Sequence, residues 1–441
     1  MKKVLAIILV VVCITSMAAC GTKNQDQNAQ TTTATTAVTS TAAETTVKKG
    51  IDMTFWIFLN PASTSDPRNV VLKEIIDSYN ANNKYGNKVT VESIDWSKFE
   101  SQAIQAAAAG TGPDIMNCFT DMLRTHIDGG TIQPMTKYAE AFIAATPDYI
   151  HKAENLKVNG EIYALPWESR ATVMWYRTDI YPTAPKSIDE IISKGSAATK
   201  NLALGYVVGL GEGSNATGLM ETFIPLIRSA GGDLLDSNGK AIFNSDAGVK
   251  VVNFLKSLVD SKTMDQTTMS MTYDDVVAGF MGGTILAMNA GTQRAAKIKS
   301  SDLAAKFSSA PMPGFDGKSA PAFVAGQQLA IGKYAKDTDL SFDFIENFYT
   351  VDNQKKWISA NVLPVRSAVY DDAEIKKLPT YNEMVMWSDY AKTGKVVFFP
   401  ADYSELSSTL AQAVQTVVFK GADAKAKLDE VANWYNQKNA K

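Results

Sequence analysis

Strand-like and helix-like segments alternate over residues 53–119. Residues 53–58, 88–94 and 113–119 have the composition of short strands, while apolar residues recur at helical spacing over residues 68–80 and 99–109. A strand–helix–strand–helix–strand order forms a parallel sheet, and such sheets bind ligands at the carboxyl ends of their strands. The sequence therefore predicts an α/β fold with a site in the loops that follow these strands.

A second region of the same kind follows further along the chain. Residues 202–210 form a predicted buried strand, and residues 217–229 a helix. Asn238-Gly239 lies between two short apolar runs and predicts a hairpin over residues 234–243. Further helices are predicted over residues 339–349, 404–419 and 424–437. Ser245 is predicted to cap another helix that begins directly after it. Two α/β lobes are expected, without an internal repeat.

The first residues have the pattern of an export signal. Lys2 and Lys3 precede an apolar stretch over residues 4–14, which is too short to span a bilayer comfortably. Met17-Ala18-Ala19-Cys20 then resembles the lipobox of a bacterial lipoprotein signal, whose cysteine becomes lipidated; ordinary cleavage near Ala19 with release is the alternative. The predicted signal peptide is residues 1–20. Residues 21–49 contain almost no large apolar side chain, so they form a flexible tether.

The composition excludes several classes of function. The net charge is −3 and no basic block occurs, so nucleic acid is not an expected partner. The two histidines lack metal-ligand partners at suitable spacing, and no cofactor motif is present; a glycine-rich run at 211–216 lacks the acidic strand end of a dinucleotide site. Only Cys118 remains after Cys13 and Cys20, so no intrachain disulfide is expected, and Cys118 is predicted to be a small buried residue rather than a reactive thiol.

Six motifs occur together in one order along the chain: GTGPDI at 110–115, IQPM at 132–135, NGEIYALP at 159–166 followed by WYRTD at 175–179, FMGGTILAM at 280–288, GQQLAI at 326–331 and LPVR at 363–366. With the lipobox in front, this series resembles the family 1 extracellular solute-binding proteins of ABC importers, the maltose-binding-like group. The resemblance runs from about residue 50 to the C-terminus.

The resemblance implies a two-lobed flytrap fold, each lobe a mostly parallel central sheet flanked by helices. Residues 50–166 and 291–325 would form the N-terminal lobe, and residues 170–290 and 326–441 the C-terminal lobe. The chain would cross between the lobes three times, near residues 166–170, 290–291 and 322–326. The implied function is that of a monomeric receptor on the outer face of the cytoplasmic membrane, in the periplasm where an outer membrane exists. It would bind a sugar or oligosaccharide between the lobes and deliver it to an ABC importer permease, with no enzymatic activity, no metal and no cofactor.

Two other functions remain open at this point. The same fold could bind a non-sugar or acidic solute, for which Arg170 and Arg294 would suit an anion. A surface glycoside hydrolase is the remote alternative, with a carboxylate pair hidden among several candidates: Asp114, Asp121, Glu168 and Glu221.

A sugar presents an apolar ring face and a rim of hydroxyls, so its site needs aromatic and planar polar side chains. The loops and crossovers supply the predicted contacts: Asn60, Trp96, Asp121, Trp167, Glu168, Arg170, Glu221, Gln293, Gln327 and Trp387. Tyr403 is a further aromatic candidate. For Trp96 the alternative is a core position, and for Glu168 it is an ion pair with Arg170 that stiffens the crossover. Arg366 is expected in a structural ion pair. Residues 292–294 carry no aromatic side chain where many relatives have one, which argues against a malto-oligosaccharide.

Overall fold

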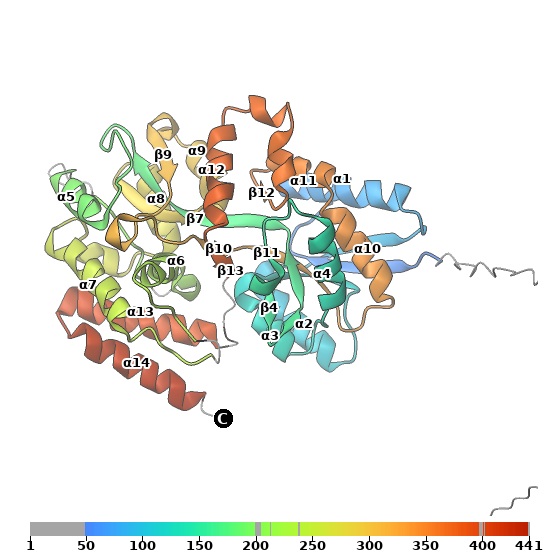
Figure 1. The fold of residues 1–441 in the computed structure, drawn as a ribbon, viewed down its shortest axis with the longest axis horizontal. Coiled ribbons are helices and arrows are strands. Elements are labelled where there is room, and N and C mark those ends of the chain that lie inside the picture. Colours follow the sequence, from blue (N-terminus) through green and yellow to red (C-terminus); the bar gives the residue numbers. More distant parts are fainter. Residues whose placement is uncertain are drawn as a thin grey trace, which may run out of the picture. The chain divides into compact units, whose positions relative to one another are not determined.

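The computed structural model describes residues 49–198, 204–211, 213–236, 239–396, 400 and 402–439. The predicted signal peptide, Cys20 and nearly all of the predicted tether lie outside the described residues. Two large sheets with their covering helices, and one small two-stranded sheet, organise the described residues (Figure 1). Within the part of the chain that is described, no helix has the length and apolar character needed to cross a membrane.

Five strands form the first sheet, in the order β2 (Lys88–Ser93), β1 (Asp52–Ile57), β3 (Ile115–Phe119), β11 (Gln327–Ile331) and β6 (Ala164–Pro166). Strand β1 pairs in parallel with both β2 and β3, which confirms the predicted parallel unit. Helices α1 (Pro67–Asn82) and α2 (Phe99–Ala108) connect these strands. Helix α1 begins where Asp66 caps it and Pro67 occupies its first turn, and it buries Val71, Ile75 and Tyr79.

The second sheet is built around the long strand β7 (Glu168–Arg177). Its antiparallel neighbours are β12 (Leu363–Pro364), β10 (Phe323–Ala325), β8 (Ala287–Gly291) and β9 (Phe307–Ala310). Strand β13 (Lys395–Val396) pairs in parallel with β10. The prediction of a mostly parallel sheet in both lobes is therefore wrong. In the second sheet one central strand receives antiparallel partners from distant parts of the chain, and in the first sheet β11 pairs antiparallel with both β3 and β6.

The predicted strand at 202–210 is also absent as a strand within residues 204–210. Two isolated parallel bridges replace it, Leu204 with Ile285 and Val207 with Met288. The predicted hairpin is confirmed by the antiparallel bridge between Leu235 and Ala241.

The lobe assignment of two segments needs correction. Strands β9 and β10, within residues 291–325, pair with β7 in the second sheet rather than joining the first lobe. Strand β11 pairs with β3 and β6 in the first sheet, and α10 (Thr338–Phe348) and α11 (Val351–Ile358) pack there too. Phe344 and Phe348 both contact Phe55 of β1 edge to face. The chain thus returns to the first sheet at the third crossover and leaves it again at β12, which pairs with β7.

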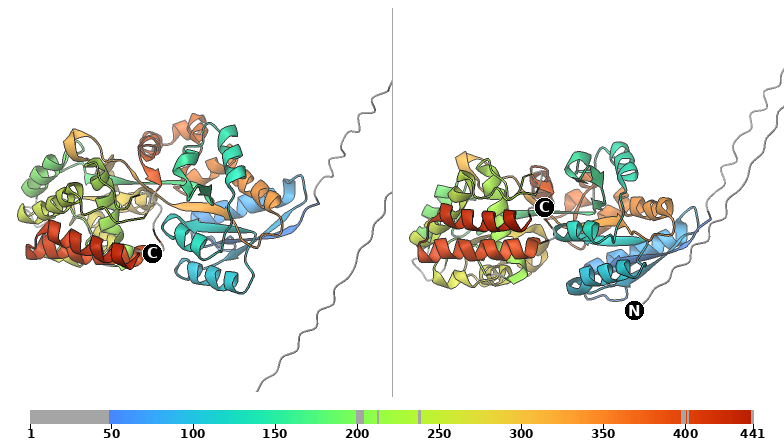
Figure 2. Two further views of the ribbon diagram at one scale, coloured as in Figure 1. Left: turned by 60° about the horizontal axis from the view of Figure 1, so that its bottom comes forward. Right: turned by 90° about the horizontal axis from the view of Figure 1, so that it is seen from below.

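Helices of the second lobe surround a common core. Helix α13 (Tyr403–Lys420) packs against α6 (Gly213–Ser229), α7 (Asp246–Asp260) and α14 (Ala424–Lys438), and Figure 2 shows α13 and α14 side by side. Helix α12 (Tyr381–Ala391) packs on β7. The helices predicted at 217–229, 339–349, 404–419 and 424–437 are confirmed. Ser245 does precede α7, but its side chain makes no capping hydrogen bond.

Shorter elements complete the fold. They are α3 (Leu123–Asp128), α4 (Thr136–Ala145), β4 (Lys157–Val158), β5 (Glu161–Ile162), α5 (Ile188–Ala198), α8 (Tyr273–Met281) and α9 (Ala295–Lys299). Cys118 is free and fully buried in β3, as predicted.

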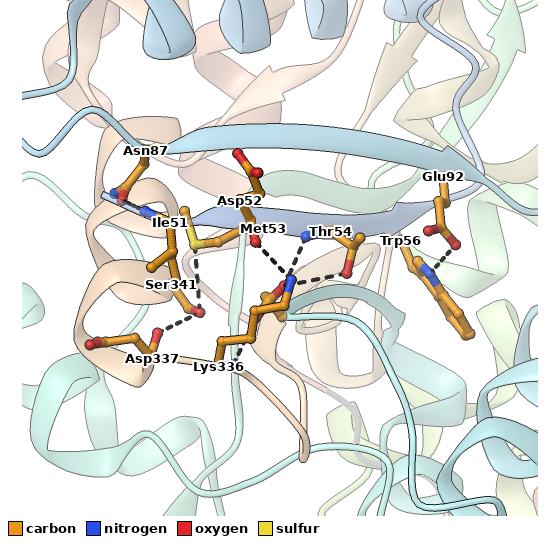
Figure 3. A network of polar contacts seen from close by, with 11 residues as sticks. Ile51, Asp52, Met53, Thr54, Trp56, Asn87, Glu92, Lys336, Asp337 and Ser341 are labelled. Carbon is orange, nitrogen blue, oxygen red and sulfur yellow. Dashed lines mark hydrogen bonds and ion pairs between the residues drawn. The ribbon is translucent and has the colours of Figure 1, made fainter. Parts of the chain in front are cut away.

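Asp114, from the GTGPDI motif, joins three elements of the first lobe. Its buried carboxylate accepts hydrogen bonds from the backbone N–H of Thr54 at 2.8 Å and of Lys336 at 2.7 Å. The Lys336 ammonium lies 3.2 Å from the same carboxylate and donates to the carbonyl of Asp52 (Figure 3). Asp114 is therefore a structural carboxylate and is not available as half of a catalytic pair.

Candidate functional site

A cavity of about 420 Å³ lies where loops of the first sheet meet β7, α6 and α13. This volume falls within the range of small-molecule sites. The lining residues are Trp96, Glu100, Phe119, Asp121, Met122, Arg170, Thr217, Met220, Glu221, Phe323, Ala325, Gly326, Gln327 and Tyr403. Six of the predicted contacts are among them: Trp96, Asp121, Arg170, Glu221, Gln327 and the further candidate Tyr403.

The strand ends supply the first-lobe wall. Trp96 begins a short 3-10 helix after β2, and Asp121 lies in another one directly after β3. Both positions are at the carboxyl ends of parallel strands, where α/β sheets place their ligands. The Trp96 side chain is 64% exposed although it lines the cavity, so it has an open ring face rather than a core position. Its predicted alternative as a core residue does not hold.

An ion pair crosses the second-lobe wall. Nη2 of Arg170, on β7, lies 2.6 Å from Oε1 of Glu221, on α6. The Glu221 side chain is only 1% exposed. Within the part of the chain that the structure describes, Arg170 Nε and Glu221 Oε2 are both buried without a hydrogen-bond partner. The structure thus corrects the predicted partner of Arg170, since the bonded carboxylate is Glu221 and not Glu168.

Electrostatics keep the Arg170 guanidinium charged. Burial by itself would lower the pKa of Arg170, but the Glu221 carboxylate, with smaller effects of Tyr273 and Glu168, raises that pKa above its usual value. Arg170 therefore presents a fixed cation whose charge is balanced inside the wall.

Two more carboxylates line the cavity without such a partner. Asp121 and Glu100 have no salt-bridge partner among the described residues. Burial raises the pKa of Asp121, against the lowering effect of Arg170, and burial also raises the pKa of Glu100, to which Asp121 adds. The effect of Asp121 on the pKa of Glu100 indicates that the two carboxylates interact electrostatically.

Glu168 lies behind the cavity wall rather than in it. The side chain is buried, and burial raises the pKa of Glu168 despite the opposing Arg170 and Arg68. Gly326, which does line the cavity, has φ +138°, a conformation that favours glycine, and a Cβ built on it would lie 3.0 Å from Oε1 of Glu168. Glu168 and Gly326 are packed together at the crossover, so the predicted direct contact of Glu168 with solute is not supported.

Trp167 is a core residue, contrary to the predicted contact. It is fully buried, with its ring 4.7 Å from that of Trp357 and its Nε1–H donating to Asn117 Oδ1 at 3.0 Å. Asn117 in turn donates to Oε1 of Gln327 at 2.7 Å. The Trp167 indole is packed in the apolar core of the first lobe. Its connection to the cavity therefore runs through Asn117 to the lining residue Gln327.

Trp387 is also placed in a core. Its side chain is 4% exposed, its Nε1–H donates to Ser309 Oγ at 2.9 Å, and its ring lies 5.8 Å from that of Trp175. The predicted ligand contact is therefore wrong for the arrangement observed, since Trp387 is on the face of α12 that packs against β7. The expectation that Trp175 is core is confirmed.

The remaining predicted contacts lie away from the cavity lining. Asn60 is exposed and its Oδ1 accepts from the backbone N–H of Ala62, so it stabilises its own turn. Gln293 is exposed after β8 and is not among the lining residues. Arg294 pairs with Asp274 at 2.6 Å. Arg366 forms the expected structural pair, donating two hydrogen bonds to Asp148 at 2.8 Å.

Several lining residues were not predicted from the sequence. Glu100 follows Trp96 by four residues, and Thr217 precedes Glu221 by four residues on α6. Residues four apart share a helix face, so this spacing could have identified Thr217 once Glu221 was chosen. Phe119, Met122, Met220 and Phe323 are apolar residues that no sequence signal separates from core positions. Among the described residues, no group of three His, Cys, Asp or Glu side chains could hold a metal ion.

Relatives of known description resemble this chain over part of their length. A probable ABC transporter-binding protein of Deinococcus radiodurans is 25% identical over 290 residues, which cover 60% of this chain and 66% of that protein. The arabinooligosaccharide-binding protein of Bacillus subtilis is 26% identical over 246 residues, which cover 54% of this chain and 55% of that protein. The matches thus span just under two thirds and just over half of these two relatives.

Solved structures show the fold more completely. The cyclic alpha-maltosyl-1,6-maltose binding protein of Arthrobacter globiformis superposes with a TM-score of 0.75 at 19% identity, covering 88% of this chain and 98% of that one. The sugar-binding protein MalE of Xanthomonas citri gives 0.72 at 19% identity, with 88% and 96% covered. The predicted two-lobed binding-protein fold is confirmed by these likenesses. The sequence model of one protein family, the bacterial extracellular solute-binding proteins, matches residues 74–383. Members of this family are receptors rather than enzymes. Since this match covers more than half of the sequence, the chain belongs to the bacterial extracellular solute-binding protein family.

Proposed function

We propose that this protein is a receptor that binds a sugar or oligosaccharide in the cavity and delivers it to the permease of an ABC importer. The observation that carries the proposal is that one cavity is lined both by the exposed ring of Trp96 and by the polar pair of Arg170 and Glu221. An exposed aromatic ring suits the apolar face of a sugar, while charged, planar groups suit its hydroxyls. Similar proteins of Bacillus subtilis include an arabinooligosaccharide-binding protein and a maltodextrin-binding protein, which supports the same solute class.

Binding to both lobes would drive the receptor cycle. Trp96 and Asp121 belong to the first lobe, and Arg170, Glu221 and Tyr403 to the second. A solute that contacts both walls stabilises the closed arrangement more than the open one, so it shifts the population toward closure. The permease would then recognise the closed receptor. No bond in the solute needs to break.

The same proposal places the protein outside the cell. Residues 1–20 would direct export, Cys20 would carry a lipid anchor, and residues 21–49 would tether a monomeric receptor to the outer face of the membrane. Metabolic labelling with a clickable fatty acid tests the anchor. Label that appears in the wild-type protein and disappears in Cys20→Ser is expected, and equal labelling of both would contradict the anchor.

A thermal-shift screen tests the solute class. The panel contains neutral sugars and oligosaccharides, uronates, amino acids and polyamines. A solute at about a hundred times its dissociation constant adds about 2.7 kcal/mol to the free energy of unfolding, so the true class produces an obvious shift. A shift only with saccharides, and its reduction in Trp96→Ala, is the expected result. A shift only with amino acids or polyamines would overturn the saccharide proposal.

The two alternative functions that the sequence left open, binding of an acidic solute and glycoside hydrolysis, receive less support. An acidic solute would need a free cation, but Arg170 is paired with Glu221 and Arg294 with Asp274. For a glycoside hydrolase, Asp114 is held by Lys336 and backbone N–H groups, and Glu221 by Arg170. Incubation with oligosaccharides should yield no new reducing ends, and turnover would refute the receptor proposal.

A further inference from the structure

The charges on the cavity wall do not balance. Among the described residues that line it, the acidic side chains are Glu100, Asp121 and Glu221, and the basic one is Arg170. Arg170 and Glu221 neutralise each other at 2.6 Å. Glu100 and Asp121 therefore leave the cavity with an excess of negative charge.

The surroundings of these two carboxylates suit a cation. Glu100 is half-buried one turn beyond Trp96, and Asp121 is half-buried two residues beyond Phe119. The exposed face of Trp96 lines the same cavity, and the faces of tryptophan rings attract ammonium groups. Among the described residues, Glu168 and Arg68 lie behind the wall, where their opposite charges offset each other, and neither lines the cavity.

A buried acceptor points in the same direction. Oε2 of Glu221 has no hydrogen-bond partner among the described residues, although its side chain is only 1% exposed. A buried carboxylate oxygen without a donor is costly, and a ligand N–H or O–H would relieve it. A ligand carboxylate could not donate, and it would add to the negative charge already present.

On the basis of the proposed function, we propose that the cavity selects saccharides by charge: it binds those with a basic amine, held by Asp121 and Glu100, more tightly than neutral ones, and it rejects uronates. The amine would lie between the two carboxylates and against the ring of Trp96. The sugar hydroxyls would contact Arg170 and Glu221. This assignment reverses the expectation that arginines at the crossovers favour an acidic solute.

Calorimetric titration of a matched series tests the proposal. The probes are glucose, glucosamine and glucuronate, together with the β-1,4-linked dimers of glucose and of glucosamine and with cellobiouronate. The amine is expected to bind at least about tenfold more tightly than its neutral counterpart, a difference of about 1.4 kcal/mol, and the uronates not at all. Raising the salt concentration should weaken binding of the amine and leave the affinity for the neutral sugar unchanged.

Neutral isosteres identify the residues responsible. In Asp121→Asn and Glu100→Gln the preference for the amine should shrink by about tenfold, while binding of the neutral sugar changes less. Glu74→Gln, an exposed carboxylate on α1 outside the cavity, is the matched control and should keep the full preference. Melting temperatures of all variants show that they remain folded.

The outcomes separate two failures. If neutral sugars bind as tightly as amines, or if uronates bind best, charge selection is refuted while the receptor function stands. Unchanged preference in both isosteric variants would also refute it. If no saccharide of any charge binds here or in the thermal-shift screen, the proposed function itself fails.

Discussion

Arg170 Nη2 lies 2.6 Å from Glu221 Oε1, and this contact ties β7, the strand that leads out of the first crossover, to α6 of the second lobe. The two residues are separated by 51 positions in the sequence. Both line the cavity, and each retains one buried polar atom for which the described residues supply no hydrogen-bond partner. The pair therefore serves two purposes: it joins two elements, and it forms a polar wall that a solute can complete.

Removing either partner of this pair should destabilise the protein. Arg170→Ala leaves the buried Glu221 carboxylate without its compensating cation, and Glu221→Ala leaves the Arg170 guanidinium without its carboxylate. Each substitution should lower the free energy of unfolding by about 3 kcal/mol. The double variant should lose less than the sum, and urea denaturation of the four proteins measures the difference. The exposed pair Lys73–Asp77 on α1 is the control, and Asp77→Ala should lose no more than about 0.5 kcal/mol. Strictly additive losses would show that the two side chains are not coupled.

Trp96→Ala should separate binding from stability. The ring is 64% exposed, so its loss should change the melting temperature little, while binding of the saccharide found in the screen should weaken by about tenfold or more. Trp56→Ala is the matched control, because Trp56 lies outside the cavity with its Nε1–H on Glu92 (Figure 3). Equal affinities of Trp96→Ala and the wild type would show that Trp96 does not contact the solute.

Trp167→Ala should behave in the opposite way. Trp167 is fully buried against Trp357 and Phe348, so truncation should reduce the free energy of unfolding by about 3–5 kcal/mol. Trp167→Phe keeps most of the apolar volume but leaves Asn117 without its indole donor, and should lose less. Chemical denaturation measures both. A Trp167→Ala protein as stable as the wild type but unable to bind would restore the direct ligand contact expected from the sequence.

Acidification should weaken the fold through two buried histidines. Burial lowers the pKa of His126 and of His151 to about 4, compared with about 6.5 in an unfolded chain. As the pH falls from about 6.5 to about 4, the unfolded state therefore binds protons that the native state refuses, and the free energy of unfolding declines by up to roughly 3 kcal/mol for each histidine.

Variants isolate this contribution. The raised pKa values of Asp121 and Glu168 act in the opposite sense, because the native state takes up those protons first. His151→Gln should thus lose less stability than the wild type between about pH 7 and about pH 5, as measured by denaturation at each pH. Parallel pH profiles of the two proteins would contradict a neutral buried His151.

Much of the first lobe could be predicted from local sequence patterns. The spacing of Val71, Ile75 and Tyr79 defines α1, and the strands on either side of it pair in parallel as expected. Trp96 and Asp121 were identified because each follows a strand of a parallel unit, which fixes the edge of the sheet at which they lie.

The rest depended on contacts between distant residues. Whether β11 joins β3 or β7 is decided by pairing across more than 200 residues, which periodicity does not encode. Trp167 and Trp96 have the same side chain, but only the surrounding core, Trp357 in one case and open cavity in the other, separates their roles. In the same way, the partner of Arg170 is Glu221 on another element and not the neighbouring Glu168.

Titration of saccharide into the wild type, Trp96→Ala and Asp121→Asn tests most directly whether the cavity between β7, α6 and the first-lobe loops is the solute site. The solute is the saccharide with the largest thermal shift in the screen, and Glu74→Gln is titrated in parallel. Wild type and Glu74→Gln are predicted to bind equally, Trp96→Ala about tenfold or more weakly, and Asp121→Asn more weakly than wild type by a smaller factor for a neutral sugar, all at unchanged melting temperature. Equal affinity in all four proteins would contradict the account, because the solute would then bind elsewhere.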